Sequence, residues 1–148
     1  MDENPNPSEA PFADAATLAE LARLSAAAQA AAPGDTAPWA ALWAATLALP
    51  RWIFIARGDE QHPSPFMAVM DEGPMLMAFT TPERAREGGL SLGLPEGELG
   101  RLLAVPGGAA VDWVASFAQH GVVGIAFDHP TLGYFSPLAN LPRIRDWL

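Results

Sequence analysis

The chain has 148 residues, of which 50% are apolar and 17% charged, with a formal net charge of −9 and a pI near 4.5. This composition is typical of one globular domain, and the acidic balance disfavours nucleic acids and anionic membranes, because both need clustered cations. Cysteine is absent and all eight basic residues are arginine, which excludes disulfides, thiolate chemistry and lysine Schiff bases.

The amino terminus and the hydropathy indicate where the protein acts and where its domain begins. No apolar run approaches the roughly 20 residues that span a bilayer. The first residues are acidic, whereas a signal peptide would be basic. We therefore predict a cytoplasmic protein with no membrane contact, a disordered acidic tail over residues 1–13 and a single domain over residues 14–148.

Two amphipathic helices are predicted at the start of the domain. The first begins at Asp14 or Thr17 and ends before a Pro-Gly pair, and the second begins at Thr36. Apolar residues recur at helical spacing in both. Trp39 and Trp43 lie one turn apart in the second helix, so we expect both to anchor the core.

A buried strand and a hairpin are predicted next. Arg51 to Ala56 is a continuous apolar run that is typical of a central strand covered on both faces. Phe66 to Met70 and Met75 to Phe79 flank the turn Asp71–Pro74, in which Gly73 can adopt a positive φ. Because side chains alternate along a strand, Met67 and Val69 should point opposite to Phe66, Ala68 and Met70.

The hairpin leads directly into a short helix. Thr81 can cap this helix with Pro82 in its first position. Gly88-Gly89 is expected to break the helix, and Leu90 to Leu94 is expected to form a short strand.

The last third of the chain has the pattern of a βαβ unit. Leu102 to Val105 and Val122 to Phe127 are apolar strands, and the helix Ala109 to His120 lies between them, which favours a parallel pair. Tyr134-Phe135 is a short returning strand, and Asn140 caps a final helix. The predicted fold is a single α+β or α/β domain with a mixed sheet of about five strands, an antiparallel hairpin plus the βαβ unit, packed with helices.

Three segments together resemble the SseB-like (enhanced serine sensitivity) family. They are the hairpin turn Asp71–Pro74, the Phe-Thr-Thr-Pro-Glu join that begins at Phe79, and the two glycine-led segments that begin at Gly121 and Gly133. The resemblance covers roughly residues 36–148. It implies a compact α/β domain of largely unassigned function, with no catalytic residues that can be carried across to this chain. Asp128-His129-Pro130 stands where the family usually has Asn-Pro.

Several short motifs also fit ordinary structural explanations. Gly89 to Gly93 matches the G-x-S-x-G of a nucleophile elbow, but no strand is predicted before it. Asp59 to His62 could hold a hard cation, although a solvated loop is the simpler explanation. Val105 to Ala110 could present amide groups to an anion, or its glycines could simply make a tight turn. We predict neither a metal nor a cofactor.

The candidate binding residues are Asp128, His129, Tyr134 and Arg84. Asp128 and His129 follow a buried strand end, where sites of α/β proteins are commonly found. Tyr134 lies on the next strand, and Arg84 is a possible cationic partner. If these residues form a binding lip, His129 and Tyr134 should be partly exposed; if they are structural, they should pack on the core.

Two functions remain open on the sequence alone. The favoured one is a non-catalytic protein-interaction or regulatory module, with self-association as one option, because the methionine-rich hairpin can adapt to a partner surface. The alternative is a small-ligand-binding domain or an enzyme that uses the Asp128-His129 turn.

Overall fold

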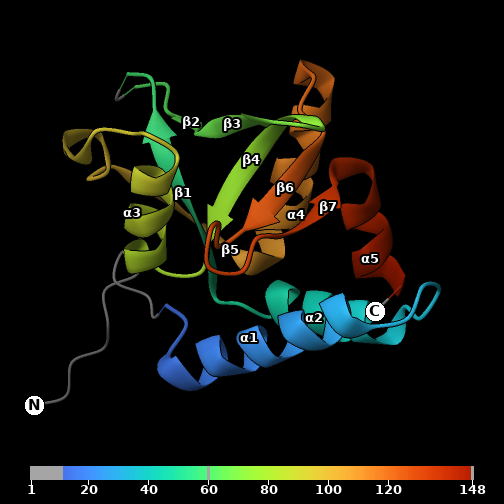
Figure 1. Ribbon diagram of the computed structural model, residues 1–148. Coiled ribbons are helices and arrows are strands. Elements are labelled where there is room, and N and C mark those ends of the chain that lie inside the picture. Colours follow the sequence, from blue (N-terminus) through green and yellow to red (C-terminus); the bar gives the residue numbers. More distant parts are fainter. Residues whose placement is uncertain (1–11, 60, 148) are drawn as a thin grey trace, which may run out of the picture.

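The structure, a computed structural model that describes residues 12–59 and 61–147, is organised around the strand β1 (Arg51–Arg57) (Figure 1). β1 pairs antiparallel with β5 (Leu102–Pro106) along one edge and with β4 (Gly73–Phe79) along the other. The short strand β2 (Ser64–Pro65) pairs with the last two residues of β1. Four consecutive side chains from Trp52 to Ile55 are fully buried, which confirms the predicted central strand.

The other half of the sheet contains the only parallel pairing among the described strands. β4 runs parallel to β6 (Gly124–Phe127), and β6 pairs antiparallel with β7 (Tyr134–Pro137). The hairpin strand β3 (Met67–Met70) pairs with β4. The described residues thus form a seven-stranded sheet with the path β2–β1–β4–β6–β7, in which β5 adds to β1 and β3 to β4. The predicted mixed sheet in a single α+β domain is confirmed.

The predicted parallel pairing within the βαβ unit is wrong in one respect. β5 and β6 run in the same direction, but β1 and β4 lie between them in the sheet. The connection, made of α4 (Gly107–Ala115) and the 3₁₀ helix η3 (Ser116–His120), therefore crosses two strands. The sequence pattern gives strand direction but not strand order, because strand order depends on pairings between distant segments.

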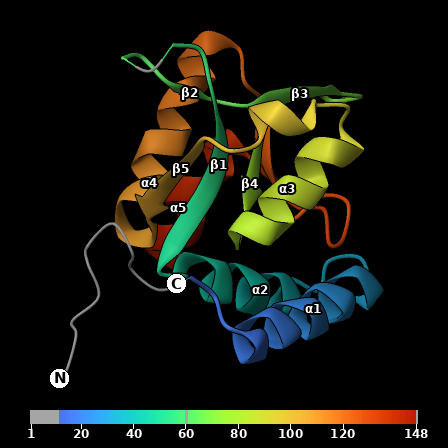
Figure 2. The same ribbon diagram turned by 90° about the vertical axis from the view of Figure 1, so that its left-hand side faces the viewer.

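Helices cover both faces of the sheet. α1 (Ala15–Ala30), α2 (Ala37–Leu47), α4 and α5 (Leu141–Trp147) contribute to one core together with Trp52, Phe54 and Phe127. α3 (Pro82–Ser91) covers the opposite face, where it packs on Ile53, Ile55 and other apolar side chains (Figure 2). Two 3₁₀ turns, η2 (Glu96–Glu98) and η4 (Leu138–Asn140), complete the described elements.

The predicted starts of α1, α2 and α3 are confirmed, with different capping chemistry at each, whereas α4 begins at Gly107, two residues before its predicted start. The Asp14 carboxylate accepts the Thr17 backbone N–H at 2.8 Å, so Asp14, and not Thr17, caps α1. Thr81 Oγ1 accepts the Arg84 N–H at 3.1 Å and caps α3. Thr36 precedes α2 without a side-chain cap hydrogen bond. The predicted acidic tail lies outside the described residues except for positions 12 and 13.

Gly88-Gly89 does not break α3, which continues to Ser91, and no strand forms at residues 90–94. Both glycines lie where the helix meets the sheet most closely. A Cβ atom on Gly88 would lie 2.2 Å from Phe79 Cε1 and 2.5 Å from the His129 carbonyl oxygen, and one on Gly89 would lie 2.4 Å from Leu99 Cδ2. The pair is there because the helix needs close approach, not because the chain must turn.

The two tryptophans of α2 have different environments. Trp43 lies in the core in edge-to-face contact with Phe127 and Tyr134, as predicted. Trp39 is more than one-third exposed, so the prediction that it anchors the core is wrong. It lies in the first turn of α2, beside a pocket that the sequence pattern did not indicate.

Candidate functional site

The predicted site lies at the carboxyl ends of the parallel strands β4 and β6. Asp128 follows β6 with a φ of 55°, and the residue is only 1% exposed. Its Oδ1 accepts the Thr80 backbone N–H at 2.8 Å, and its Oδ2 accepts the Thr80 hydroxyl at 2.7 Å. Arg84 Nη1, from the first turn of α3, lies 3.4 Å from the same Oδ2. The carboxylate thus joins the end of β6 to the junction between β4 and α3.

The electrostatics of this carboxylate are dominated by burial. Desolvation raises the pKa of Asp128 above its ordinary value, while the two Thr80 hydrogen bonds and the Arg84 charge act in the opposite direction. Glu87 adds a smaller contribution that also raises the pKa. Each carboxylate oxygen of Asp128 already has a partner from the protein. These contacts connect the end of β6 to Thr80 and to the first turn of α3.

Tyr134 belongs to the core on the opposite side of the sheet from α3. Its ring stacks on Phe127 with a centroid separation of 5.5 Å, and its hydroxyl lies 2.8 Å from Thr46 Oγ1. Thr46 donates its own hydroxyl proton to the Leu42 carbonyl, so Tyr134 donates to Thr46. Burial raises the pKa of Tyr134. Of the two alternatives left open for Tyr134, the structure thus shows the structural one, in which the side chain packs on the core.

The four predicted site residues do not form one site. Asp128 and Arg84 are in contact, and His129 follows Asp128 with a half-buried side chain. Tyr134 contacts α2 on the face of the sheet opposite to α3. His129 also leads into a cis peptide bond with Pro130, and its carbonyl oxygen lies close to Gly88. Two hollows, one beside Arg57 and one beside Trp39, are lined by other residues.

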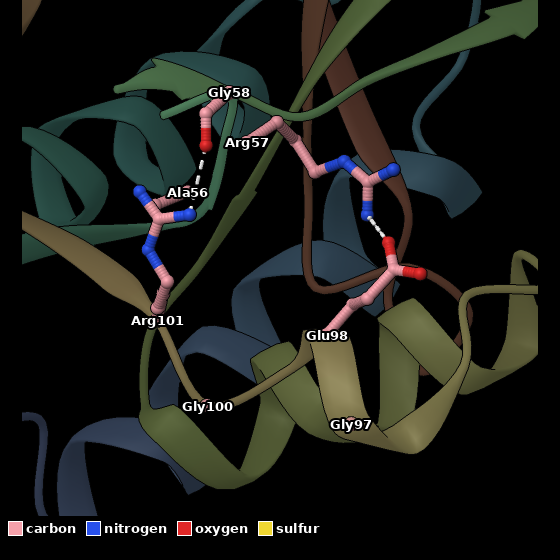
Figure 3. A pocket seen from close by; sticks show the side chains of 7 residues that line it. All are labelled: Ala56, Arg57, Gly58, Gly97, Glu98, Gly100 and Arg101. Atoms are coloured by element: carbon pink, nitrogen blue, oxygen red, sulfur yellow. Dashed lines mark hydrogen bonds and ion pairs between the residues drawn. The ribbon is translucent and has the colours of Figure 1, made fainter. Parts of the chain in front are cut away.

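A hollow of about 300 Å³ between the end of β1 and the start of β5 contains two arginines (Figure 3). Arg57 forms an ion pair with Glu98, and Arg101 donates to the Gly58 carbonyl at 2.8 Å and to the Asp59 carbonyl at 3.3 Å. An incoming anion would have to displace these partners in a chain with a net charge of −9. The two arginines tie neighbouring loops together, and exposed ion pairs of this kind contribute about 0–1 kcal/mol.

A second pocket, of about 280 Å³, lies between α2, β7 and α5, and we call it the aromatic pocket. Trp39 and Phe135 are both more than one-third exposed beside it, and the buried Trp43 also lines it. Its lining contains no charged side chain; the other lining residues are Thr36, Ala40, Ser136, Pro137, Asn140 and Ile144. The aromatic pocket is thus suited to an uncharged apolar group.

The outer face of the hairpin is open, and the predicted alternation of its side chains is confirmed. Val69 is 84% exposed and Met67 is 39% exposed, whereas Ala68 is buried and Met70 is half-buried. Val69 pairs with Pro74 across β3 and β4, and the Pro74 carbonyl accepts the N–H of Val123, which is 39% exposed. Met67, Val69, Pro74 and Val123 therefore form a continuous apolar surface, which we call the hairpin patch.

The weaker motifs have structural explanations. Ser91 ends α3 and follows no strand, so it is not at a nucleophile elbow. Gly107 begins α4 where a Cβ would lie 2.3 Å from the Leu49 carbonyl oxygen, so close packing, more than turn geometry, requires this glycine. Asp59 Oδ1 accepts the N–H groups of Gln61 and His62 in a local turn. No group of three or more potential ligands is placed to hold a metal among the described residues.

The sequence pattern did not predict two of the exposed apolar residues. Val123 shares a face with the buried Ile125 and Phe127, so its period-two pattern is that of a core residue. Phe135 was predicted as part of a strand, but nothing indicated that it would line a pocket. Exposure at both positions depends on where the covering helices end, which no local pattern records.

Comparisons of the chain with protein-family models, curated proteins and solved structures find no match in any of the three. Within residues 12–59 and 61–147, no helix is long and apolar enough to cross a membrane.

Proposed function

We propose that this protein is a non-catalytic protein-interaction module that acts in the cytoplasm and docks a protein partner on the hairpin patch. The SseB-like resemblance is part of this proposal. The observation that carries it is the exposure of Met67, Val69 and Val123 on one continuous surface over β3, β4 and the residue that precedes β6. Contiguous exposed apolar surface is a common mark of protein-binding sites.

The chemistry of the hairpin patch supports a protein partner over other ligands. Methionine is flexible and polarizable, so Met67 can adapt to the shape of an apolar partner surface. The net charge of −9 disfavours nucleic acid and anionic lipid, which need cationic surfaces.

The alternative, a ligand site or active site at Asp128-His129, has less support. A catalytic carboxylate must have access to its substrate, whereas Asp128 is buried and bonded to Thr80 through both oxygens. Tyr134, the other predicted contributor, is directed toward Thr46 in the core. These contacts account for both residues as structural elements.

Site-specific photo-cross-linking in cells tests the proposal. A photoreactive amino acid at Val69 should produce discrete cross-linked products with a protein that can be identified by mass spectrometry and shown to bind after purification. Leu90 is the matched control, because it is an exposed apolar residue on α3, away from the hairpin patch. Identical products from both positions, or none from Val69, would count against the interaction module.

A second candidate function is the binding of a small uncharged aromatic molecule in the aromatic pocket. The specific observation is the pair of exposed rings, Trp39 and Phe135, around an uncharged hollow of about 280 Å³. Indole titrated into ¹⁵N-labelled protein should shift the Trp39 side-chain N–H resonance and the amides of residues 135–137. The Trp39→Ala variant should abolish the amide shifts. Shifts spread over the whole chain would argue against a defined site.

A further inference from the structure

The outer edge of β3 has backbone groups that point away from the sheet. Phe66 O accepts the Met77 N–H at 3.3 Å, and the two-residue turn pairs Met70 with Gly73. In an antiparallel pair, hydrogen-bonded and non-hydrogen-bonded positions alternate. Ala68 and Met70 therefore bond to β4, whereas the N–H and C=O groups of Met67 and Val69 point outward.

No strand covers this edge in the described part of the chain. There β3 pairs with β4 alone, and the two views of the ribbon place β3 at the top of the molecule with no strand beyond it (Figures 1 and 2). The register from Met67–Leu76 to Met70–Gly73 is continuous, so β3 has no bulge. Natural edge strands are often kept short, or are protected by charged residues, proline or a bulge. The strand β3 has four residues, but its sequence Met-Ala-Val-Met contains no charge and no proline, and it has no bulge.

The charges around this edge distinguish between its possible occupants. Asp71 and Glu72, in the turn at the end of β3, are exposed, and neither forms an ion pair with another described residue. A second copy of the chain would bring another net charge of −9 to the same surface. Net charge of this size opposes self-association, whereas a cationic partner would be attracted.

We propose that β3 receives an extended segment of another protein by strand addition, and that this segment carries apolar side chains with lysine or arginine at its end. Its main chain forms hydrogen bonds with the outward N–H and C=O groups of Met67 and Val69, and these bonds supply the affinity. Its apolar side chains cover the hairpin patch, and its cations meet Asp71 and Glu72. This inference rests on the proposed interaction function and specifies the partner.

The test uses the full chain and two acetylated, amidated peptides. The first is Lys-Lys-Val-Thr-Val-Thr-Val-Lys-Lys, and the second has glutamate in place of every lysine. We expect the lysine peptide to bind in calorimetric titrations, with an affinity that falls as salt rises, and the glutamate peptide to bind at least tenfold more weakly.

Two variants of Val69 separate strand pairing from nonspecific charge attraction. Val69→Pro removes the outward N–H but no bond to β4, and proline is tolerated on edge strands. Val69→Thr keeps that N–H and the β-branched shape. Strand addition predicts at least a tenfold loss of affinity in V69P and a smaller loss in V69T. The double variant D71N/E72Q should weaken the lysine peptide severalfold. Equal affinity of V69P and V69T would overturn strand addition.

Hydrogen exchange gives a readout that does not depend on whether V69P folds. In the free wild-type protein, the amides of Met67 and Val69 should exchange faster than those of Ala68 and Met70. Saturating lysine peptide should protect the first pair selectively. If those amides stay unprotected while the peptide binds, the proposed pairing is wrong.

Light scattering on the wild-type chain tests whether β3 instead pairs with a second copy of the same chain. A dimer that V69P converts to a monomer would mean that β3 pairs with a second copy, which overturns the basic partner but leaves an interaction module standing. If a specific partner cross-links at Val69 but leaves the Met67 and Val69 amides unprotected, strand addition is contradicted while the proposed interaction function stands. The absence of any specific cross-link at Val69 would instead contradict the proposed function itself.

Discussion

The close approach of α3 to the sheet predicts opposite effects for two glycine-to-alanine substitutions. Gly88 and Gly108 both lie within α-helices, and alanine is the better helix former by about 1 kcal/mol. A Cβ atom added to Gly108 would have no other atom within 4 Å, whereas at Gly88 it would lie 2.2 Å from Phe79 Cε1. Propensity alone therefore predicts stabilisation at both positions, and packing predicts it only at Gly108.

The magnitude at Gly88 follows from which neighbours can move. The Phe79 ring is fully buried in the core, and the second contact, at 2.5 Å, is the backbone carbonyl of His129, which cannot rotate away. Overpacking a core costs about 1–3 kcal/mol, and the upper part of this range, about 2–3 kcal/mol, applies here because the new methyl group would meet both neighbours at less than 3 Å. After the gain in helix propensity, Gly88→Ala should lower the free energy of unfolding by about 1–2 kcal/mol. Gly108→Ala should raise it by about 0.5–1 kcal/mol.

Urea denaturation of the wild-type protein and both variants measures these effects. The Gly88→Ala variant should also melt about 2–8 °C lower than the wild-type protein, given the usual scaling for a chain of this size. An unchanged m-value would show that the substitution affects the folded state and not the compactness of the unfolded chain. If Gly88→Ala proves as stable as Gly108→Ala, the explanation of the glycine pair by close packing is wrong.

Further predictions concern the two buried polar groups. Burial raises the pKa of Asp128 above its ordinary value of 3.8 in the folded protein. The protonated group therefore contributes its full share to the free energy of unfolding below that pH, and this share is lost as the pH rises through the folded-state pKa. Asp128→Asn should therefore gain stability relative to the wild-type protein between about pH 3.5 and pH 7 in urea titrations; a relative loss would contradict burial as the main cause. Tyr134→Phe should cost about 1 kcal/mol, because Thr46 keeps its bond to Leu42. Thr46→Val should cost more, about 1–3 kcal/mol, because it leaves the Tyr134 hydroxyl buried without an acceptor, and equal melting temperatures for these two variants would contradict the assigned proton direction. Tyr134→Ala should lower the free energy of unfolding by about 3–5 kcal/mol, as large aromatic truncations do. A loss within about 0.5 kcal/mol would instead support the alternative in which Tyr134 is part of a binding lip.

Local chemistry in the sequence predicted most of the element boundaries. Asp14 and Thr81 accept backbone N–H groups at helix starts, and Gly73 adopts the positive φ that the hairpin turn needs. The alternation of Met67 and Val69 with their neighbours also needed no tertiary information. These features depend on contacts within a few residues, so the pattern that encodes them is present in the sequence.

The role of a residue was harder to predict than the element that contains it. The Asp128-His129 turn has the composition of an accessible site, but the side chain of Asp128 turns inward to Thr80, which lies 48 residues earlier. Tyr134 likewise reaches Thr46, 88 residues away. Whether a polar side chain faces solvent or a partner in the core depends on which distant segment lies opposite, and no local pattern specifies that segment.

The sequence by itself determined the helices, most of the strands, the alternation of side chains along the hairpin and the acidic charge of this protein, because propensity, periodicity and composition are local quantities. The hairpin turn is tighter than predicted: Met70 pairs with Gly73, and Gly73 and Pro74 belong to β4. Only the tertiary structure decided the order of the strands, the close approach of α3 at Gly88 and the openness of β3. Strand order and exposure depend on how much apolar area each arrangement removes from water, and that area is a property of the whole chain. The free edge at Met67 and Val69 exists because β3 pairs with β4 and with no other described strand.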